Sequence, residues 1–358
     1  MRRLFPLFLA AVLACSVTPT APLLSQTKTR CIIHTDSAHV KIDTCTVTTT
    51  PPPPAPAPPP PPPPPPAGCL RSVSVSTVGS LLTALGTALA GDCILLAPGT
   101  YTLAGSLTIS KGGTATAPVV IRGAGTTSII NVNGHSVFLD ASYTHLTNLR
   151  LTNFTTVGFW LRGVTGDVLD SLEIDHSQQE LVAIKNGSNH NTISHSIFHD
   201  SGISNGQYGE GVYIGNSGVL DFKVTDNQIL TNHFGPNVRA EAIDLKEGAD
   251  RTIIRGNYID GTGAYYYSGT GTLVALKSSG VVIDSNYMQI GMYQAVAFEA
   301  PIASVMSGNV ATNNRIDLRN SIGYGFQFQA GTVNPMGAVI SCNNVMVSGL
   351  LSNRPCTP

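Results

Sequence analysis

The sequence predicts an all-β protein, a right-handed parallel β-helix (a solenoid of stacked coils) with a short N-terminal capping helix. Three observations lead to this prediction. A four-residue strand pattern recurs at intervals of roughly 22 to 30 residues, the length of one β-helix coil. A second strand family ends repeatedly in asparagine. The composition, with 36 glycines and 11% charged residues among 358, is typical of many short strands and tight turns.

The recurring strand has the form apolar, any residue, apolar, polar. Because side chains alternate along a strand, the first and third residues of each copy are expected to point inward and to stack on those of neighbouring coils. The second and fourth residues then form two outward columns. Eight copies are present: 137–140, 159–162, 182–185, 212–215, 243–246, 274–277, 296–299 and 326–329.

The second strand family follows these copies and ends in Asn227, Asn257, Asn286 and Asn309. Asparagine tolerates the left-handed backbone conformation that a bend requires, and its side-chain amide can bridge adjacent coils. We therefore expect an asparagine ladder with a structural role.

The first 24 residues have the layout of a secretory signal. Arg2 and Arg3 precede an apolar run that is too short to span a bilayer. The stretch 12–15, Val-Leu-Ala-Cys, also resembles a bacterial lipobox, which would make Cys15 a lipid-anchored N-terminus; ordinary cleavage is the alternative. We therefore expect a secreted or cell-surface protein without a transmembrane span.

Three further segments follow the signal. Residues 25–50 form a short Thr-rich stalk with a cysteine pair, residues 51–67 a polyproline linker, and residues 68–358 the β-helix domain. The proline run favours an extended polyproline II spacer. Apolar residues at helical spacing over 78–90 predict the capping helix.

Cysteine positions support export. Beyond Cys15 the cysteines fall into three local couples: Cys31 with Cys45, Cys69 with Cys93, and Cys342 with Cys356. Three disulfides would fit an oxidising compartment, and buried free thiols are the alternative.

Two stretches, 91–101 (GDCILLAPGTY) and 117–123 (APVVIRG), resemble the opening coils of the pectate-lyase-like β-helix superfamily. The resemblance implies the fold and not, by itself, an activity. Residues 173–176 (EIDH) are only faintly similar to a motif of true pectate lyases. The paired-aspartate, Gly-His-Gly and Arg-Ile-Lys motifs of polygalacturonase-type hydrolases are missing.

Charged residues are scarce in this sequence, and a group of them concentrates on adjacent coils between residues 180 and 277. Equivalent residues on neighbouring coils lie about 4.8 Å apart, so these groups are expected to form one patch. The patch comprises two lysines in the fourth-position column, one aspartate in the second, and three glutamates at the turns entering the strands: Lys246, Lys277, Asp244, Glu180, Glu210 and Glu241.

Stacked lysines suggest a base. Two ammonium groups about 5 Å apart at an effective dielectric near 20 repel by roughly 3 kcal/mol, about two pKa units. Stacking of Lys246 on Lys277 is therefore expected to lower a lysine pKa, beside carboxylates that can hold a cation. A solvated charged sheet whose acids and bases neutralise one another is the alternative.

The resemblance to β-helix polysaccharide lyases implies a chemistry for this patch. Several of these enzymes bind Ca²⁺ through acidic residues on one sheet and use Lys or Arg to remove the proton beside a uronate carboxylate. By position, Lys246 is the candidate base and Lys277 the candidate acid or charge stabiliser. The candidate Ca²⁺ ligands are Glu210, Glu241 and Asp244.

Substrate contacts are expected from the charged columns and from the long loops 231–240 and 262–271. Aromatic rings stack on sugar faces, and basic groups pair with uronate carboxylates. For the aromatic loop residues, a hydrophobic lid is the alternative. We assign substrate binding to Arg162, Lys185, Tyr213, Arg239 and Tyr266.

Three function classes stay open. A lyase that cleaves uronate-containing, acidic polysaccharide by β-elimination leads. A glycoside hydrolase could use Asp244 with Glu210 or Glu241 as its carboxylate pair, and a non-catalytic surface adhesin could bind glycan without cleaving it. A net charge of −1 gives no electrostatic argument for nucleic acid as a partner, and we expect a monomer.

Overall fold

The computed structural model describes residues 27–35, 40–49, 68–204, 206–218, 223–264, 271–289, 294–299, 307–319, 323–329 and 337–358. The chain divides into two units, Met1–Ala57 and Pro58–Pro358. In the first unit, β1 (Thr27–Thr35) pairs antiparallel with β2 (Val40–Thr49), and Cys31 stands opposite Cys45 in this register. The predicted signal with Cys15, the proline linker and the side chains of the Cys31–Cys45 couple lie outside the described residues.

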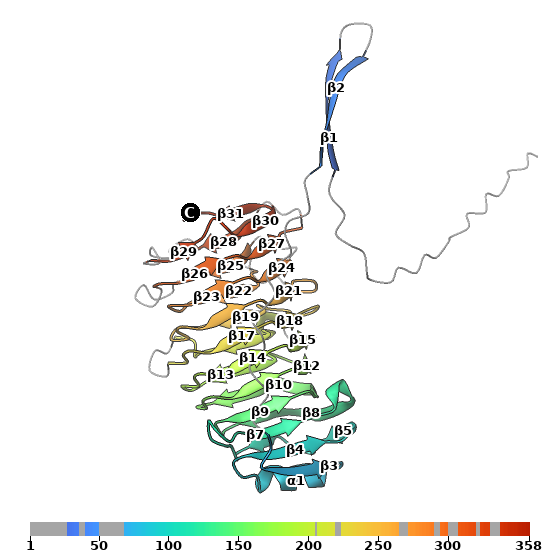
Figure 1. Cartoon of the computed structure of the whole chain (residues 1–358), viewed down its shortest axis with the longest axis vertical. Coiled ribbons are helices and arrows are strands. Elements are labelled where there is room, and N and C mark those ends of the chain that lie inside the picture. The colour runs from blue at the N-terminus through green and yellow to red at the C-terminus, as the bar shows by residue number, and fades with distance from the viewer. Residues whose placement is uncertain are drawn as a thin grey trace, which may run out of the picture. The chain divides into compact units, whose positions relative to one another are not determined.

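The second unit is built from three parallel sheets, and the coils stack one above another (Figure 1). We name them sheets I, II and III. Sheet I has eleven strands. They are β3 (Arg71–Val75), β4 (Asp92–Leu96), β7 (Val119–Arg122), β9 (Thr144–Thr147), β11 (Val168–Asp170), β14 (Thr192–Ser194), β17 (Gln228–Leu230), β20 (Ile253–Arg255), β23 (Val282–Asp284), β26 (Val310–Thr312) and β29 (Val339–Ile340).

Sheets II and III share two long strands, β8 (Ser128–Leu139) and β10 (Arg150–Arg162), whose first halves pair in sheet II and second halves in sheet III. Sheet II also contains β5 (Gly99–Thr102), β12 (Glu173–Ser177), β15 (Ile197–His199), β18 (His233–Phe234), β21 (Tyr258–Asp260), β24 (Tyr287–Gln289), β27 (Arg315–Asp317) and β30 (Val345–Ser348). Sheet III also contains β6 (Leu107–Ile109), β13 (Val182–Lys185), β16 (Val212–Ile214), β19 (Ile243–Leu245), β22 (Val274–Leu276), β25 (Gln294–Phe298), β28 (Tyr324–Phe328) and β31 (Leu350–Ser352). Short 3-10 helices, η1 (Gly125–Thr127) and η2 (Gly206–Tyr208), lie in connections.

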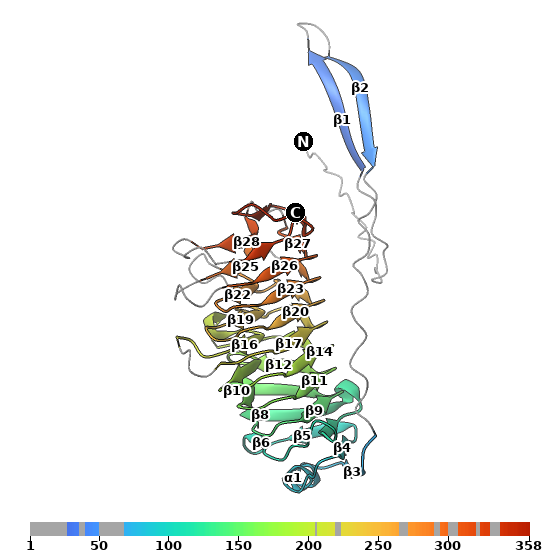
Figure 2. The ribbon, with the colours of Figure 1, turned by 60° about the vertical axis from the view of Figure 1, so that its left-hand side comes forward.

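Pairing in sheet III confirms the predicted alignment of the strand copies and with it the parallel β-helix. Residue for residue, the first inward position pairs in the order Val137, Phe159, Val182, Val212, Ile243, Val274, Val296 and Phe326. These side chains are fully buried. Figure 2 shows the stacked coils from another side. Phe298 and Phe328 stack between coils with ring centroids 4.4 Å apart. A continuous apolar core therefore runs along the whole stack.

The predicted asparagine ladder exists, but as two ladders rather than one. Asn257 and Asn286 follow sheet I strands, and the Asn257 amide donates to Asn286 Oδ1 at 2.9 Å. Asn227 instead precedes β17, where it accepts from Asn191 Nδ2 at 3.0 Å; Asn309 likewise precedes β26. The prediction of a single ladder is wrong because asparagines stand at the bends on both sides of sheet I. Sequence spacing does not distinguish the two bends.

Helix α1 (Val78–Gly86) lies at the N-terminal end of the stack, as predicted (Figure 1). The Thr77 hydroxyl accepts from the Ser80 backbone N–H at 3.1 Å, which caps the helix. Leu81 is buried against the core. The helix ends before Leu89, which is 65% exposed although the predicted helix included it.

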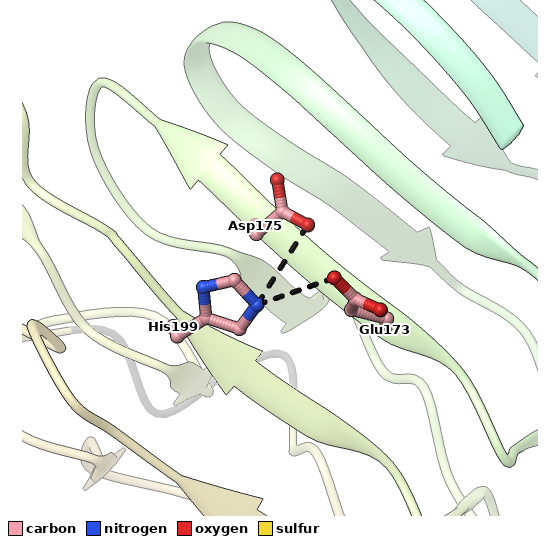
Figure 3. A group of neighbouring side chains, drawn as sticks. All are labelled: Glu173, Asp175 and His199. Carbon is pink, nitrogen blue, oxygen red and sulfur yellow. Dashed lines mark ion pairs between the residues drawn. The ribbon is translucent and has the colours of Figure 1, made fainter. Parts of the chain in front are cut away.

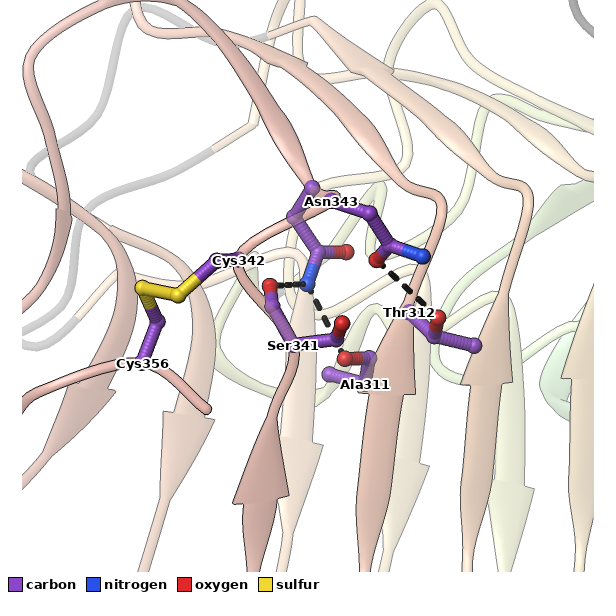
Figure 4. The surroundings of a disulfide bond; sticks show 7 residues. Ala311, Thr312, Ser341, Cys342, Asn343 and Cys356 are labelled. Atoms are coloured by element: carbon purple, nitrogen blue, oxygen red, sulfur yellow. Dashed lines mark hydrogen bonds between the residues drawn. A yellow bond between two sulfur atoms is a disulfide. The ribbon is translucent and has the colours of Figure 1, made fainter. Parts of the chain in front are cut away.

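Two predicted disulfides fall on described side chains, and both are confirmed: Cys69–Cys93 and Cys342–Cys356. The second joins residues near the C-terminus beside Ser341 (Figure 4). In the described ranges, α1 included, no helix has the length and apolar character needed to cross a membrane.

Candidate active site

The charged patch predicted from the sequence lies on the outward face of sheet III. In the second-position column, Ala183 pairs with Tyr213 and Tyr213 with Asp244. Lys185, at the end of β13, lies in the fourth-position column, and Lys246 follows β19 in the same column. Strand alternation therefore brings together basic, acidic and phenolic groups from successive coils.

Three of the predicted carboxylates form one group. One oxygen each of Glu210, Glu241 and Asp244 lies within 4.8 Å of the others. Glu210 is 4% exposed and Asp244 1% exposed. Glu210 and Glu241 stand at the turns entering β16 and β19, as expected. Among the described residues, Glu210 Oε2 has no hydrogen-bond partner.

The electrostatics of this group favour a proton or a cation between the carboxyls. Burial raises the pKa of Glu210 well above its ordinary value, and Asp244, Glu180 and Glu241 add to the rise. Burial and the charge of Asp244 raise the pKa of Glu241 to about 7. Burial also raises the pKa of Glu180. Clustered carboxylate oxygens, one of them buried without a partner, fit a hard cation such as Ca²⁺.

The lysines are held by carboxylates rather than stacked on each other. Lys246 forms an ion pair with Asp244, and Lys277 Nζ lies 3.1 Å from Asp244 Oδ1 and 3.0 Å from Glu299 Oε2. Burial opposes the charge of Lys277, but Asp244 and Glu299 outweigh burial and raise its pKa. Lys277 is therefore a permanent cation at neutral pH.

The Tyr213 ring lies between the ammonium groups of Lys185 and Lys246. Lys185 Nζ is 3.3 Å and Lys246 Nζ 4.9 Å from the centroid of the Tyr213 ring. Burial lowers the pKa of Lys185 to about 8. Burial, with help from Asp244, raises the pKa of Tyr213, so its hydroxyl keeps its proton.

The remaining predicted substrate-binding residues are Arg162, Arg239 and Tyr266. Arg162 pairs with Lys185 in the strand register, and its Nε donates to Asp140 Oδ1 at 2.7 Å. Arg239 is exposed in the loop before β19. Tyr266 lies outside the described residues. Two groups had no role assigned from the sequence: Glu299, which anchors Lys277, and Glu180. Both stand in the predicted columns or turns, but the sequence does not show which atoms they reach.

A second acidic group lies on sheet II, formed by Glu173, Asp175 and His199 (Figure 3). His199 Nε2 is 3.4 Å from Glu173 Oε1 and 3.8 Å from Asp175 Oδ2. Arg150 Nε lies 2.7 Å from Asp175 Oδ2 and 3.2 Å from Glu173 Oε1, so one guanidinium is already paired with both carboxylates. This group is an ion-pair network of sheet II and is separate from the sheet III patch.

Comparison with solved structures bears on the fold. An alginate lyase from Paenibacillus sp. str. FPU-7 is 25% identical and superposes with a TM-score of 0.72, over 80% of this chain and 99% of that chain. The pectate lyase Pel9A is 15% identical with a TM-score of 0.60, over 80% and 79%. The chain has the parallel β-helix fold of these lyases. This confirms the resemblance to pectate-lyase-like proteins.

A surface adhesin has a similar fold. PfbA, a surface adhesin of Streptococcus pneumoniae, is 14% identical with a TM-score of 0.52, over 77% of this chain and 85% of that chain. No family model and no curated protein matches the sequence. The fold alone therefore does not distinguish catalysis from adhesion, and the distinction depends on the chemistry of the site.

Proposed function

We propose that this protein is an exported polysaccharide lyase that cleaves uronate-containing, acidic polysaccharide by β-elimination on sheet III. One observation carries the proposal: the Tyr213 ring lies between Lys185 and Lys246, next to a group of three carboxylates, two of them buried. The likeness to an alginate lyase over almost the whole length of that enzyme supports it.

The arrangement supplies the parts that β-elimination needs. The reaction breaks the C–H bond beside the uronate carboxylate and the glycosidic C–O bond, and forms a C=C bond without adding water. We assign Lys246 as the base that takes the proton, and Lys277 remains cationic and stabilises the developing charge. The protonated Tyr213 hydroxyl contacts the sugar and can donate a proton to the leaving oxygen. Lys185 binds a substrate carboxylate.

The carboxylate group would hold the cation. Glu210, Glu241 and Asp244 offer oxygen ligands of the kind Ca²⁺ prefers. When bound, Ca²⁺ would neutralise the uronate carboxylate and make the adjacent C–H more acidic. Asp244 also holds Lys246 and Lys277, so it would orient both lysines towards the same sugar.

The proposal is tested by screening the purified protein against a panel of uronate polymers. A lyase releases products with the ultraviolet absorbance of an unsaturated uronide, and Lys246→Ala should abolish it. Lys223→Ala is the matched control, because Lys223 is a surface lysine paired with Asp250. Unchanged cleavage by Lys246→Ala would contradict the assignment of the base. New reducing ends without that absorbance would indicate a hydrolase, and binding without cleavage an adhesin.

A further inference from the structure

Two aromatic side chains extend the outward face of sheet III beyond the proposed active site. Phe138 pairs with Trp160, Trp160 with Ala183, and Ala183 with Tyr213 in the same column. The Phe138 and Trp160 ring centroids lie 6.4 Å apart with an interplanar angle of 34°. Both side chains are half-buried, so part of each ring is exposed. The chain has one tryptophan, and it stands here.

An ion pair lies beside these rings. The Arg162 guanidinium lies 4.1 Å from the Phe138 ring centroid and is held by Asp140, which accepts from Arg162 Nε at 2.7 Å. On the other side, only the methyl group of Ala183 separates Trp160 from Tyr213 in the column. The rings therefore form an apolar surface beside the active site, and the Arg162 charge next to them is balanced by Asp140.

We propose that Phe138 and Trp160 form a stacking subsite for one pyranose unit of the polysaccharide, away from the bond that is cleaved. The inference rests on the proposed function. A pyranose ring presents a flat array of C–H groups that packs on the negative face of an aromatic ring. Trp160 and Tyr213 are two strands apart, about 10 Å, so the sugar on Trp160 is not the sugar that reacts. Because Asp140 neutralises Arg162, the subsite recognises the ring face rather than a carboxylate.

A remote subsite favours long chains over short ones, because its binding energy is available only to substrates that reach it. For Trp160→Ala we expect the ratio of kcat/KM on polymer to kcat/KM on the shortest cleaved oligosaccharide to fall about tenfold, the size of effect typical of a buried aromatic contact. Trp160→Phe, which keeps a ring, should retain most of the ratio. Tyr287→Ala, on sheet II, is the control and should keep the wild-type ratio. Equal losses on polymer and oligosaccharide in Trp160→Ala would contradict the subsite.

Binding can be observed without cleavage and without altering the subsite. Because Trp160 is the one tryptophan, intrinsic tryptophan fluorescence reports on this position. We would titrate Lys246→Ala with alginate and pectate oligosaccharides of increasing length and follow binding by calorimetry in parallel. A saturable change in emission that begins at a threshold length supports the subsite. Calorimetric binding without a change in emission overturns it, and so does the absence of binding to every oligosaccharide. An emission change in a protein that never cleaves would leave the subsite standing and refute the lyase.

Discussion

Asp167 stands at a position of the asparagine ladder that the next coils fill with asparagine. It is buried at the bend before β11, where the next coils carry Asn191 and Asn227. Its Oδ1 accepts from the Thr144 backbone N–H at 2.7 Å, while Oδ2 has no partner among the described residues. Burial raises its pKa to about 8. The folded state therefore favours the neutral acid, and the free energy of unfolding falls as pH rises from about 4 to about 8.

We expect Asp167→Asn to remove this pH dependence. The asparagine amide matches its neighbours in the ladder and carries no charge, so the free energy of unfolding at pH 9 should rise by about 1–3 kcal/mol. Urea unfolding of both proteins at pH 5 and pH 9 measures the effect. Equal stability of the two proteins at pH 9 would contradict the account of Asp167.

Lys185 gives a prediction for substrate binding. Its pKa of about 8, lowered by burial, means that its charge is lost as pH rises through that value. KM for an anionic polymer should therefore increase above about pH 8. Lys185→Arg should abolish the increase, because a guanidinium stays charged. The measurement is KM of both proteins from pH 6 to pH 10. The same rise in KM above pH 8 in Lys185→Arg would show that another group titrates.

At the scale of the residue, spacing alone grouped Glu210, Glu241 and Asp244, because Glu210 and Glu241 stand one coil period apart and Asp244 lies on the strand that follows Glu241. Spacing did not show that the pKa of Lys277 is raised. Column positions show which residues are neighbours, but not that Glu299 and Asp244 both reach the Lys277 ammonium. Such contacts depend on side-chain conformation, which the repeat does not specify.

The asparagine ladder between sheets I and II is the element whose contribution can be tested most simply. Asn257 Oδ1 accepts from the Asn232 amide at 3.1 Å, and its own amide donates to Ile229 O at 2.9 Å. Asn257→Ala leaves these buried groups without partners and should lower the free energy of unfolding by about 1–3 kcal/mol. Asn343→Ala, at an exposed asparagine, should change it by less than about 0.5 kcal/mol. Similar losses in both variants, measured by urea unfolding, would show that burial of the ladder is unimportant.

At the scale of the whole molecule, repetition made the fold predictable. The eight strand copies share one register in sheet III, and the inward positions need only be apolar for the coils to stack. The connections between strands were not predictable in the same way, since their lengths vary from coil to coil. The prediction differs from the structure at the two bends around sheet I and at the C-terminal end of α1.

Cation binding by the folded protein separates the two acidic groups. Ca²⁺ that binds the native state raises the melting temperature by mass action. We expect Ca²⁺ to stabilise the chelator-treated protein and restore its activity, and Glu210→Gln to lose the thermal shift. Glu173→Gln, in the sheet II network, should keep it. A shift lost in Glu173→Gln and kept in Glu210→Gln would place the cation on sheet II instead.

The central claim is that sheet III breaks glycosidic bonds by elimination. The most direct measurement is mass spectrometry of the products of uronate-polymer digestion. Elimination adds no water, so the account predicts products with an unsaturated non-reducing end, lighter by one water than the corresponding hydrolysis products, and their absence with Lys246→Ala. Products that are all saturated, with one water added for every bond cleaved, would mean hydrolysis and would contradict it.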